Sequence, residues 1–413
     1  NIIDAIIVGN YVGQNALAAV TSTGSLIFLL VGFFGGMSSG AGVVISRYFG
    51  AGEKEEVEKS VGTAVVFGLV SGIILTVIGT LLTPYILQLM GTPQDVFVDA
   101  TDYVRTYVMG VVFLSLYNTA SGIFQAVGDS KRPLYYLIVS SFVNIVLDLV
   151  FVRVFDMGVK GVAIATIIAQ AVSAVLAFIR LSTIKEVYRV NFKKLKFDYN
   201  KLVQILKIGI PSGIQNSVIG LANVVVQSSI NSFGAAAMAG CGAYSKIEGF
   251  AFIPINAFTM AITTFVSQNL GAKNEERVKK GARFGIIFSC VVAQAIGIIF
   301  MLFASPLISI FGKDAESIAY GISKTYVDAP FYFLLSFSHC VASVLRGAGK
   351  SSVPMTVMLS CWCVIRVLYI NIGTSILHEI AVVNWAYPLT WFLSSVIFLI
   401  YYKKSNWLKK SLQ

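Results

Sequence analysis

Charged residues are scarce in this chain of 413 residues, where Asp, Glu, Lys and Arg together account for only 12%. Soluble domains carry about 25% charged residues, so the composition excludes a water-soluble globule. Apolar residues make up 56% of the chain, and a spanning helix needs about 20 mostly apolar residues in a row. The composition therefore predicts an all-α polytopic membrane protein.

Residues that bind metals or form disulfides are also few. The chain has two histidines, His339 and His378, and five cysteines without paired spacing: Cys241, Cys290, Cys340, Cys361 and Cys363. A zinc or haem site therefore lacks ligands, and we interpret the cysteines as small buried apolar residues. An intramembrane enzyme would need a cluster of reactive residues at one depth, but the two histidines fall in different segments. We expect no catalytic residues, no cofactor and no enzymatic activity.

Apolar runs separated by charged, proline or glycine residues predict twelve transmembrane helices, of which the first is partial. The predicted spans are 1–10, 23–46, 61–83, 104–127, 134–152, 161–180, 205–230, 235–267, 283–303, 325–345, 354–376 and 382–402.

Lysine and arginine are distributed unevenly over the predicted loops. Of 31 such residues, 24 fall in the loops of one side, six fall on the other side, and Arg366 lies within a span. This bias predicts that the first side, with the C-terminus, is cytoplasmic in a multi-pass protein of the cell membrane. The net charge of +11 is thus explained by topology, and we expect no nucleic-acid partner.

The sequence contains an internal repeat with a constant displacement. Residues 46–59 resemble residues 267–280, and Gly13, Gly128 and Pro133 recur as Gly234, Gly349 and Pro354, each 221 positions later (234 − 13 = 221). Matching loops are cytoplasmic in both copies, which predicts two pseudo-symmetric six-helix bundles related by an axis along the membrane normal.

The repeat also predicts the organisation of the chain. We expect an N-terminal lobe over 1–180, a basic cytoplasmic connector over 181–204, a C-terminal lobe over 205–402 and a basic cytoplasmic tail over 403–413. The second copy opens near Lys201, and 201 − 221 = −20, so the beginning of the first helix is expected to be absent from this chain.

Four ionisable residues within the predicted spans stand out, because burial of a charge there is costly. They are Asp4, Asp148, Glu248 and Arg366. Counted at about 1.5 Å per residue from the helix ends, Asp4, Asp148 and Thr166 share one depth in the first lobe, and Asn144 lies one helical turn before Asp148.

The residues at this depth allow two interpretations. Two carboxylates in a low dielectric medium cannot both ionise cheaply, so a proton or a small cation would neutralise them. We therefore predict a coupling-ion site formed by Asp4, Asn144, Asp148 and Thr166, with Na⁺ as the one metal ion that it would accept. Alternatively, the two aspartates brace separate helix ends.

The repeat is not symmetric in charge. Asp4 corresponds to Val225 and Asp148 to Tyr369 in the second copy, so the acidic pair belongs to the first copy alone. Glu248 either pairs with Arg366 as a buried brace or faces a cavity and attracts cationic substrates. Tyr117 and Asn118 are further candidates for the wall of such a cavity.

Several of these motifs together resemble the multidrug and toxic compound extrusion (MATE) family of antiporters. They are Asp4 to Gly9 with Ala16 to Ala19, Gly50 to Gly52, Gln268 to Ala272, Gly128 to Pro133 and Asn144 to Asp148. The resemblance implies twelve helices in two lobes and export of organic cations and drugs by alternating access, coupled to H⁺ or Na⁺. It further implies that the lipid bilayer and small organic cations are the partners, and we expect a monomer.

Within this family the chain is most similar to the DinF-like branch, in which the matching positions imply a coupling role for Asp4, Asn144, Asp148 and Thr166. The NorM-like branch carries an acidic pair in its C-terminal lobe, whereas the predicted span 205–230 contains no carboxylate. The alternative function is a lipid-linked oligosaccharide flippase of related architecture, which would line its cavity with more cationic residues.

Overall fold

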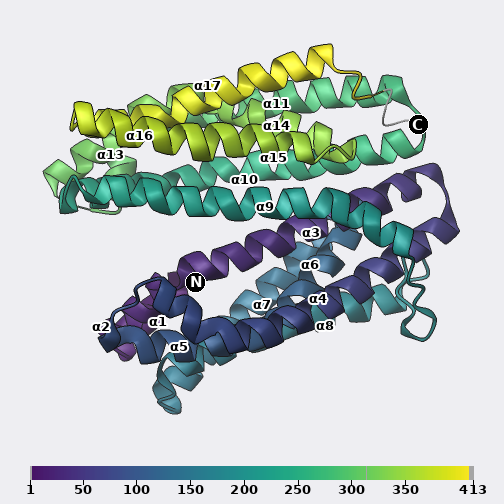
Figure 1. Cartoon of the computed structure of the whole chain (residues 1–413), viewed down its shortest axis with the longest axis horizontal. Helices are drawn as coiled ribbons and strands as arrows, with labels where there is room; N and C mark the ends of the chain where they lie inside the picture. The colour runs from purple at the N-terminus through teal and green to yellow at the C-terminus, as the bar shows by residue number, and fades with distance from the viewer. Residues whose placement is uncertain (1, 313, 409–413) are drawn as a thin grey trace. The chain divides into compact units, whose positions relative to one another are not determined.

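The computed structural model describes residues 2–312 and 314–408, and the regular elements in these residues are all helical. The chain divides into two compact units (Figure 1). Unit 1 comprises the residues up to Phe49 and Glu53–Gly213, and unit 2 comprises Gly50–Gly52 and the residues from Ile214 onward.

The helices of unit 1 are α1 (Ile2–Tyr11), α2 (Gln14–Ser22), α3 (Gly24–Ala51), α4 (Lys54–Leu89), α5 (Gln94–Met109), α6 (Val111–Ala126), α7 (Lys131–Leu149), the π-helical turn η1 (Val150–Val154), α8 (Gly158–Thr183) and the short 3₁₀ helix η2 (Phe192–Lys194). Helix α9 (Tyr199–Asn231) begins in unit 1 and continues into unit 2.

The remaining helices belong to unit 2: α10 (Ala235–Gly271), α11 (Glu275–Leu302), α12 (Ala304–Ser309), α13 (Ala315–Asp328), the 3₁₀ turn η3 (Ala329–Phe331), α14 (Tyr332–Gly347), α15 (Ser352–Met358), the π-helical segment η4 (Leu359–Ile365), α16 (Arg366–Ile376) and α17 (Ile380–Lys404).

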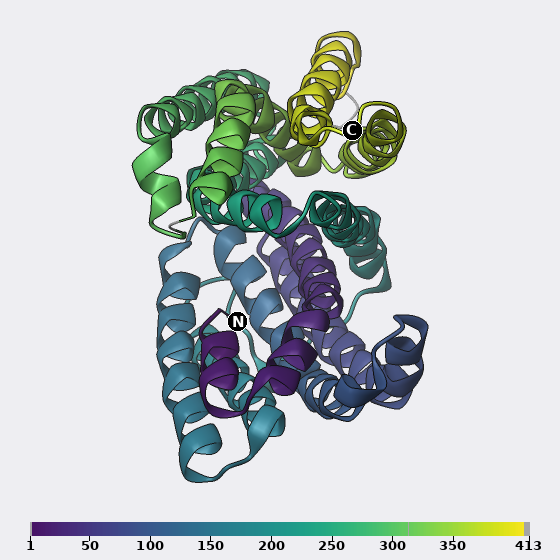
Figure 2. The ribbon, with the colours of Figure 1, turned by 90° about the vertical axis from the view of Figure 1, so that its left-hand side faces the viewer.

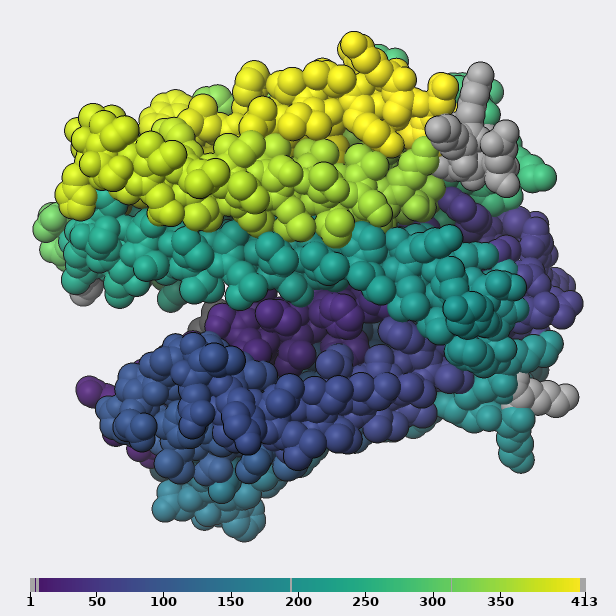
Figure 3. All heavy atoms as spheres, viewed as in Figure 1, coloured from purple at the N-terminus to yellow at the C-terminus, as the bar shows by residue number. Residues whose placement is uncertain are grey.

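In the described part of the chain, nine helices are long and apolar enough to cross a membrane, and there are ten if α5 and α6, which meet at a bend of 45°, form one span. The predicted span 104–127 misses most of α5, because Asp95, Asp99 and Asp102 lower its hydropathy. Helix α4 is seen at the surface of unit 1 in Figure 3, and it exposes an apolar stripe. The stripe consists of Ile74, Val77, Leu81 and Tyr85, an arrangement that suits contact with lipid.

Small residues allow the helices of unit 1 to approach closely. Helix α4 packs against α5 and α6, and α8 packs against α5, α6 and α7. The Ser115 hydroxyl on α6 donates a hydrogen bond of 2.6 Å to the carbonyl of Gly68 on α4. A Cβ at Gly68 would lie only 2.4 Å from the Thr119 hydroxyl, so this crossing requires glycine.

Unit 2 is built around α10 and α14, which contact each other and α11, while α14 also packs against α17. Figure 2 shows the helices of this unit nearly end-on, running alongside one another. Its core contains the fully buried side chains of Tyr332, Leu335 and Phe398 together with Trp391. The Ser289 and Ser336 hydroxyls hydrogen bond across the α11–α14 crossing at 2.7 Å.

The displacement of 221 residues recurs in these contacts. Ser115 and Gly68 correspond to Ser336 and Ser289 (336 − 115 = 221 and 289 − 68 = 221), so the same crossing is tied by a hydrogen bond in both copies. The turns after α3 and α10 correspond as well. The Glu53 amide donates to the Tyr48 carbonyl at 3.1 Å, and the Asn274 amide donates to the Asn269 carbonyl at 2.9 Å.

These paired turns share a left-handed residue, although its identity differs. Gly52 has φ of 73° and its counterpart Lys273 has φ of 55°. In the next pair of turns, both positions are glycine: Gly128 and Gly349 have φ of 87° and 81°. A left-handed backbone is free of strain for glycine but costs a residue with a Cβ about 1–2 kcal/mol. Lys273 therefore carries backbone strain that Gly52 avoids.

The first turns of α9 are fixed to unit 1 by a buried lysine. The Lys201 ammonium pairs with the Glu56 carboxylate and lies 3.6 Å above the ring of Tyr48. Next to it, the amide of Asp198 donates to the Thr63 hydroxyl at 3.0 Å. The chain that follows η2 is thus attached to the ends of α3 and α4.

Replacing Lys273 with glycine should stabilise the protein. Relief of the left-handed strain exceeds the added entropy of the unfolded chain, so we expect the free energy of unfolding to rise by about 0.5–1 kcal/mol. Chemical denaturation of the purified protein in detergent measures this change. Gly52→Ala is the matched opposite and should destabilise by about 1–2 kcal/mol. Equal losses in both variants would show that the left-handed turn is not the cause.

Candidate functional site

The two N-terminal aspartates lie in the interior of unit 1. Asp4 is on α1, Asp148 is near the end of α7, and α1 packs against α7, α8 and the π turn. Their exposed fractions are 1% and 0%, and their carboxyl groups are close enough to interact electrostatically. The structure therefore brings the two predicted acids into one buried environment.

Two tyrosines of α5 complete this environment. Tyr103 is within electrostatic reach of both aspartates, and Tyr107 is within reach of Asp4. The Tyr107 hydroxyl accepts a hydrogen bond of 3.3 Å from the side-chain amide of Gln170 on α8. The sequence-based prediction missed both tyrosines. Their spacing of four residues in a segment with a polar opposite face was the signal that could have revealed them.

The other two predicted residues are Asn144, which lies on α7 with Asp148, and Thr166, which lies on α8. The Thr166 hydroxyl on α8 donates to its own helix at Val162, at 3.0 Å, which leaves its oxygen lone pairs as acceptors. Within the described residues, the amide nitrogen of Asn144 and both carboxylate oxygens of Asp148 are buried and have no hydrogen-bond partner. Buried polar groups are seldom left unsatisfied, so this concentration makes the region a candidate functional site.

A change in helix geometry follows Asp148 directly. Helix α7 ends at Leu149, and Val150–Val154 form a π-helical turn. A π turn adds a residue to the helical repeat and rotates the side chains that follow it, and such turns are frequent at functional sites. Asp148 therefore lies one residue before the end of the regular part of α7.

The second predicted pair, Glu248 and Arg366, forms no direct ion pair in the described part of the chain. The Arg366 guanidinium instead donates two hydrogen bonds to the Thr390 hydroxyl, at 3.1 and 2.8 Å, and lies 4.3 Å above the ring of Tyr387. Glu248 accepts a long hydrogen bond of 3.4 Å from the Tyr244 hydroxyl. Arg366 and Glu248 interact electrostatically through a larger cluster.

That larger cluster also contains Lys324 and Asp328, which the sequence-based prediction did not include among the candidate site residues. Lys324 was assigned to an external loop before a span at 325–345, but α13 begins at Ala315 and the candidate span is Ala315–Gly347. Lys324 and Asp328 form an ion pair of 2.9 Å on one face of α13. Because each charge neutralises the other, the helix continues through a segment that hydropathy alone assigns to a loop.

Tyr117 and Asn118 have structural partners. The Tyr117 hydroxyl donates to the Pro133 carbonyl at 2.9 Å, which ties α6 to α7. The Asn118 side chain donates to Leu114 in its own helix at 2.9 Å, and its backbone carbonyl accepts from Ser38 of α3 at 2.5 Å. These contacts explain both residues as braces of α6.

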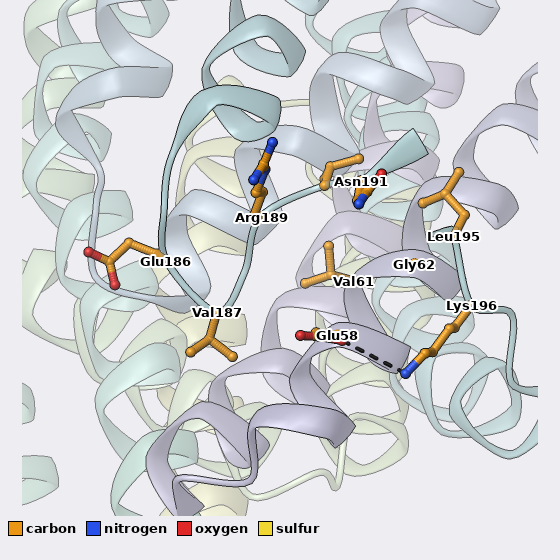
Figure 4. A pocket seen from close by; sticks show the side chains of 10 residues that line it. Glu58, Val61, Gly62, Glu186, Val187, Arg189, Asn191, Leu195 and Lys196 are labelled. Carbon is orange, nitrogen blue, oxygen red and sulfur yellow. Dashed lines mark ion pairs between the residues drawn. The ribbon is translucent and has the colours of Figure 1, made fainter. Parts of the chain in front are cut away.

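Two cavities of unit 1 lie away from the aspartates, around the segment that follows α8. The first has a volume of about 450 Å³ (Figure 4). Glu58 and Lys196 form an ion pair of 3.8 Å at its wall. It is lined by Glu58, Val61, Gly62, Glu186, Val187, Arg189, Val190, Asn191, Leu195 and Lys196. The second, of about 410 Å³, shares Glu186 with the first. The described residues contain no group of three metal-binding side chains.

Known proteins resemble the chain over nearly its whole length. The family model MatE matches residues 1–150 and 211–372. The probable multidrug resistance protein YoeA of Bacillus subtilis is 28% identical over 98% of this chain and 89% of its own length. The probable multidrug resistance protein NorM of Thermotoga maritima is 27% identical over 87% of this chain and 78% of its own length.

Solved structures share the fold at lower identity. A MATE crystal structure in the bent conformation superposes with a TM-score of 0.91 at 21% identity, covering 100% of this chain and 92% of that one. An outward-facing multidrug resistance transporter of the MOP superfamily gives a TM-score of 0.90 at 22% identity, covering 99% of this chain and 92% of that one.

Replacing Thr390 with valine should destabilise the protein, because the buried Arg366 guanidinium would lose the acceptor of two hydrogen bonds. We expect a loss of about 2–3 kcal/mol in the free energy of unfolding, measured by chemical denaturation in detergent. Thr374→Val is the control, since the Thr374 hydroxyl bonds only to carbonyls of its own helix. Similar losses in the two variants would mean that the Arg366 contact contributes little.

Proposed function

The chain belongs to the MATE family of multidrug efflux transporters, and from this premise we propose that it is a cation-coupled antiporter that exports amphipathic organic cations by alternating access. Membership makes it a multi-pass membrane transporter and not an enzyme. The observation that carries the finer proposal is the burial of Asp4 and Asp148 within electrostatic reach of each other.

In this proposal the chain forms twelve spans, the first of them partial, in two six-helix lobes. Helix α1, which has ten residues, and the proline-containing helix α9 are not among the candidate spans, and we assign them as the partial first span and the seventh span. The lobes are 1–180 and 205–402, joined by the connector 181–204, and the tail 403–413 is cytoplasmic. Support comes from the bias of basic residues toward one side and from the hydrogen bonds and turns repeated 221 residues apart.

The coupling ion binds at Asp4 and Asp148, assisted by the Asn144 amide and the Thr166 hydroxyl. Two carboxylates in a medium of low dielectric repel each other, so uptake of one positive charge is favourable. When the site is neutralised from outside, the outward-open state is favoured and substrate leaves. Release of the ion to the inside reverses this preference, which is how a bound ion shifts a two-state equilibrium.

A proton suits this site better than Na⁺. Sodium requires several oxygen ligands at once, whereas a proton needs one carboxylate oxygen. Asp148 has two buried oxygens without hydrogen-bond donors in the described part of the chain. The site therefore supplies a proton acceptor without further rearrangement.

Asp148→Asn should abolish coupled transport, because an amide cannot take up a proton or balance a cation. In proteoliposomes containing the purified chain, we expect efflux of a fluorescent organic cation driven by a pH gradient to fall at least about tenfold. Asp99→Asn on α5 is the control and should transport at the rate of the unchanged protein. Full coupled efflux in the Asp148 variant would refute the assignment.

Exchanging the gradients identifies the ion. In the same proteoliposomes, a pH gradient should drive efflux several-fold faster than a Na⁺ gradient of equal size, because the carboxyl pair offers few additional ligands for a metal ion. The initial rate of substrate movement under each gradient is the measurement. Faster efflux under the Na⁺ gradient would instead assign Na⁺ to the site.

A further inference from the structure

The ammonium of Lys324 lies in a site suited to a monovalent cation. It is 2.9 Å from the Asp328 carboxylate and 4.0 and 5.2 Å from the ring centroids of Tyr387 and Tyr244. Lys324 is 2% exposed and Asp328 is 0% exposed. A carboxylate and the faces of aromatic rings are groups that bind small cations in proteins, and here the side chain of the protein itself occupies that place.

The surrounding charges are balanced. The cluster holds two carboxylates, Glu248 and Asp328, and two cations, Lys324 and Arg366. The Arg366 guanidinium is held by Thr390 and Tyr387, so Lys324 is the partner in direct contact with Asp328. The remaining titratable groups near Lys324 are Tyr244, Tyr387 and Cys241. With Lys324 in place, the two carboxylates are matched by two cations, so the cluster needs no additional positive charge to be neutral.

The internal repeat places this cluster at the same positions of the fold as the aspartate site of unit 1. Subtracting 221 from 324, 328 and 387 gives 103, 107 and 166, which are Tyr103, Tyr107 and Thr166. Helix α13 thus corresponds to α5, and α17 corresponds to α8. The region that surrounds a buried acidic pair in the first copy holds a covalently attached ammonium in the second.

We propose that Asp328, together with the rings of Tyr244 and Tyr387, forms a cation site that Lys324 fills permanently, so that unit 2 takes up no external cation. This assignment of Lys324 deepens the proposed function. It rests on that function in one respect, because it confines ion uptake to Asp4 and Asp148. Removal of the Lys324 charge leaves Asp328 buried without its ion-pair partner. A monovalent cation from solution then takes the vacated place.

The test compares variants of the full chain in which the first site is silenced by Asp148→Asn. Binding of ²²Na⁺ and of the K⁺ analogue ⁸⁶Rb⁺ to purified protein is measured by scintillation proximity. We expect no saturable binding to the D148N protein. Adding Lys324→Met should create one site per chain, at least about tenfold tighter than any residual binding. Adding Asp328→Asn as well should remove it again.

Controls separate this outcome from trivial ones. Lys246→Met, at an exposed lysine of the same unit, should create no site, and Lys324→Arg, which retains the charge, should create none either. A monodisperse Lys324→Met protein that binds neither ion overturns the proposal, since Asp328 would then be neutralised by a proton. If the Lys324→Met protein does not fold, the D148N protein decides alone, because binding that depends on Asp328 while Lys324 is present also overturns it. Retention of coupled efflux by D148N would instead contradict the proposed function.

Discussion

The cost of burying charge in a low dielectric interior governs this structure. Each unit keeps ionisable groups away from water, and each compensates them differently. In unit 1, Asp4 and Asp148 are buried within electrostatic reach of each other and of Tyr103, and within the described residues both oxygens of Asp148 lack a hydrogen-bond donor. In unit 2, Lys324 and Asp328 neutralise each other, while Arg366 is held by Thr390. The acidic pair of unit 1 therefore contrasts with the ion pair of unit 2, and the proposal of ion uptake by unit 1 rests on this contrast.

The duplicated scaffold makes this contrast informative. Hydrogen bonds and turns recur 221 residues apart, as the Ser115–Gly68 and Ser289–Ser336 contacts show. Packing positions have thus retained their function in both copies, whereas charged positions have diverged. Helix packing tolerates few changes at close crossings, whereas a charge can be exchanged wherever a partner is supplied. The differences between the two copies therefore report on function more directly than their similarities do.

Much of the framework was predictable from sequence. The predicted spans 134–152 and 161–180 lie within Lys131–Val154 and Gly158–Thr183, because long apolar runs leave little choice of structure. Asp4 and Asp148 could be placed together from their depth along straight helices. Lys324 and Asp328 could not, since hydropathy counts each charge separately and ignores that the two are one helical turn apart.

Pairing between distant helices was also beyond the sequence. Glu248 and Arg366 were natural partners by charge, but the Arg366 guanidinium is committed to a hydroxyl on α17, which depends on tertiary packing. The π-helical turn after Asp148 is equally invisible in residue types, because Val150–Val154 would suit an ordinary helix. Local sequence determines that these segments are helical, and neighbouring helices determine their exact course.

The turn at Lys273 has a consequence for how such a molecule evolves. Its backbone keeps the shape of the turn at Gly52 and the same amide-to-carbonyl bond five residues back, although the glycine is gone. The same turn geometry can therefore be kept by a residue with a Cβ, as long as the rest of the domain supplies a margin of stability. Genetic drift in one copy is then limited by that margin more than by the local preferences of individual amino acids.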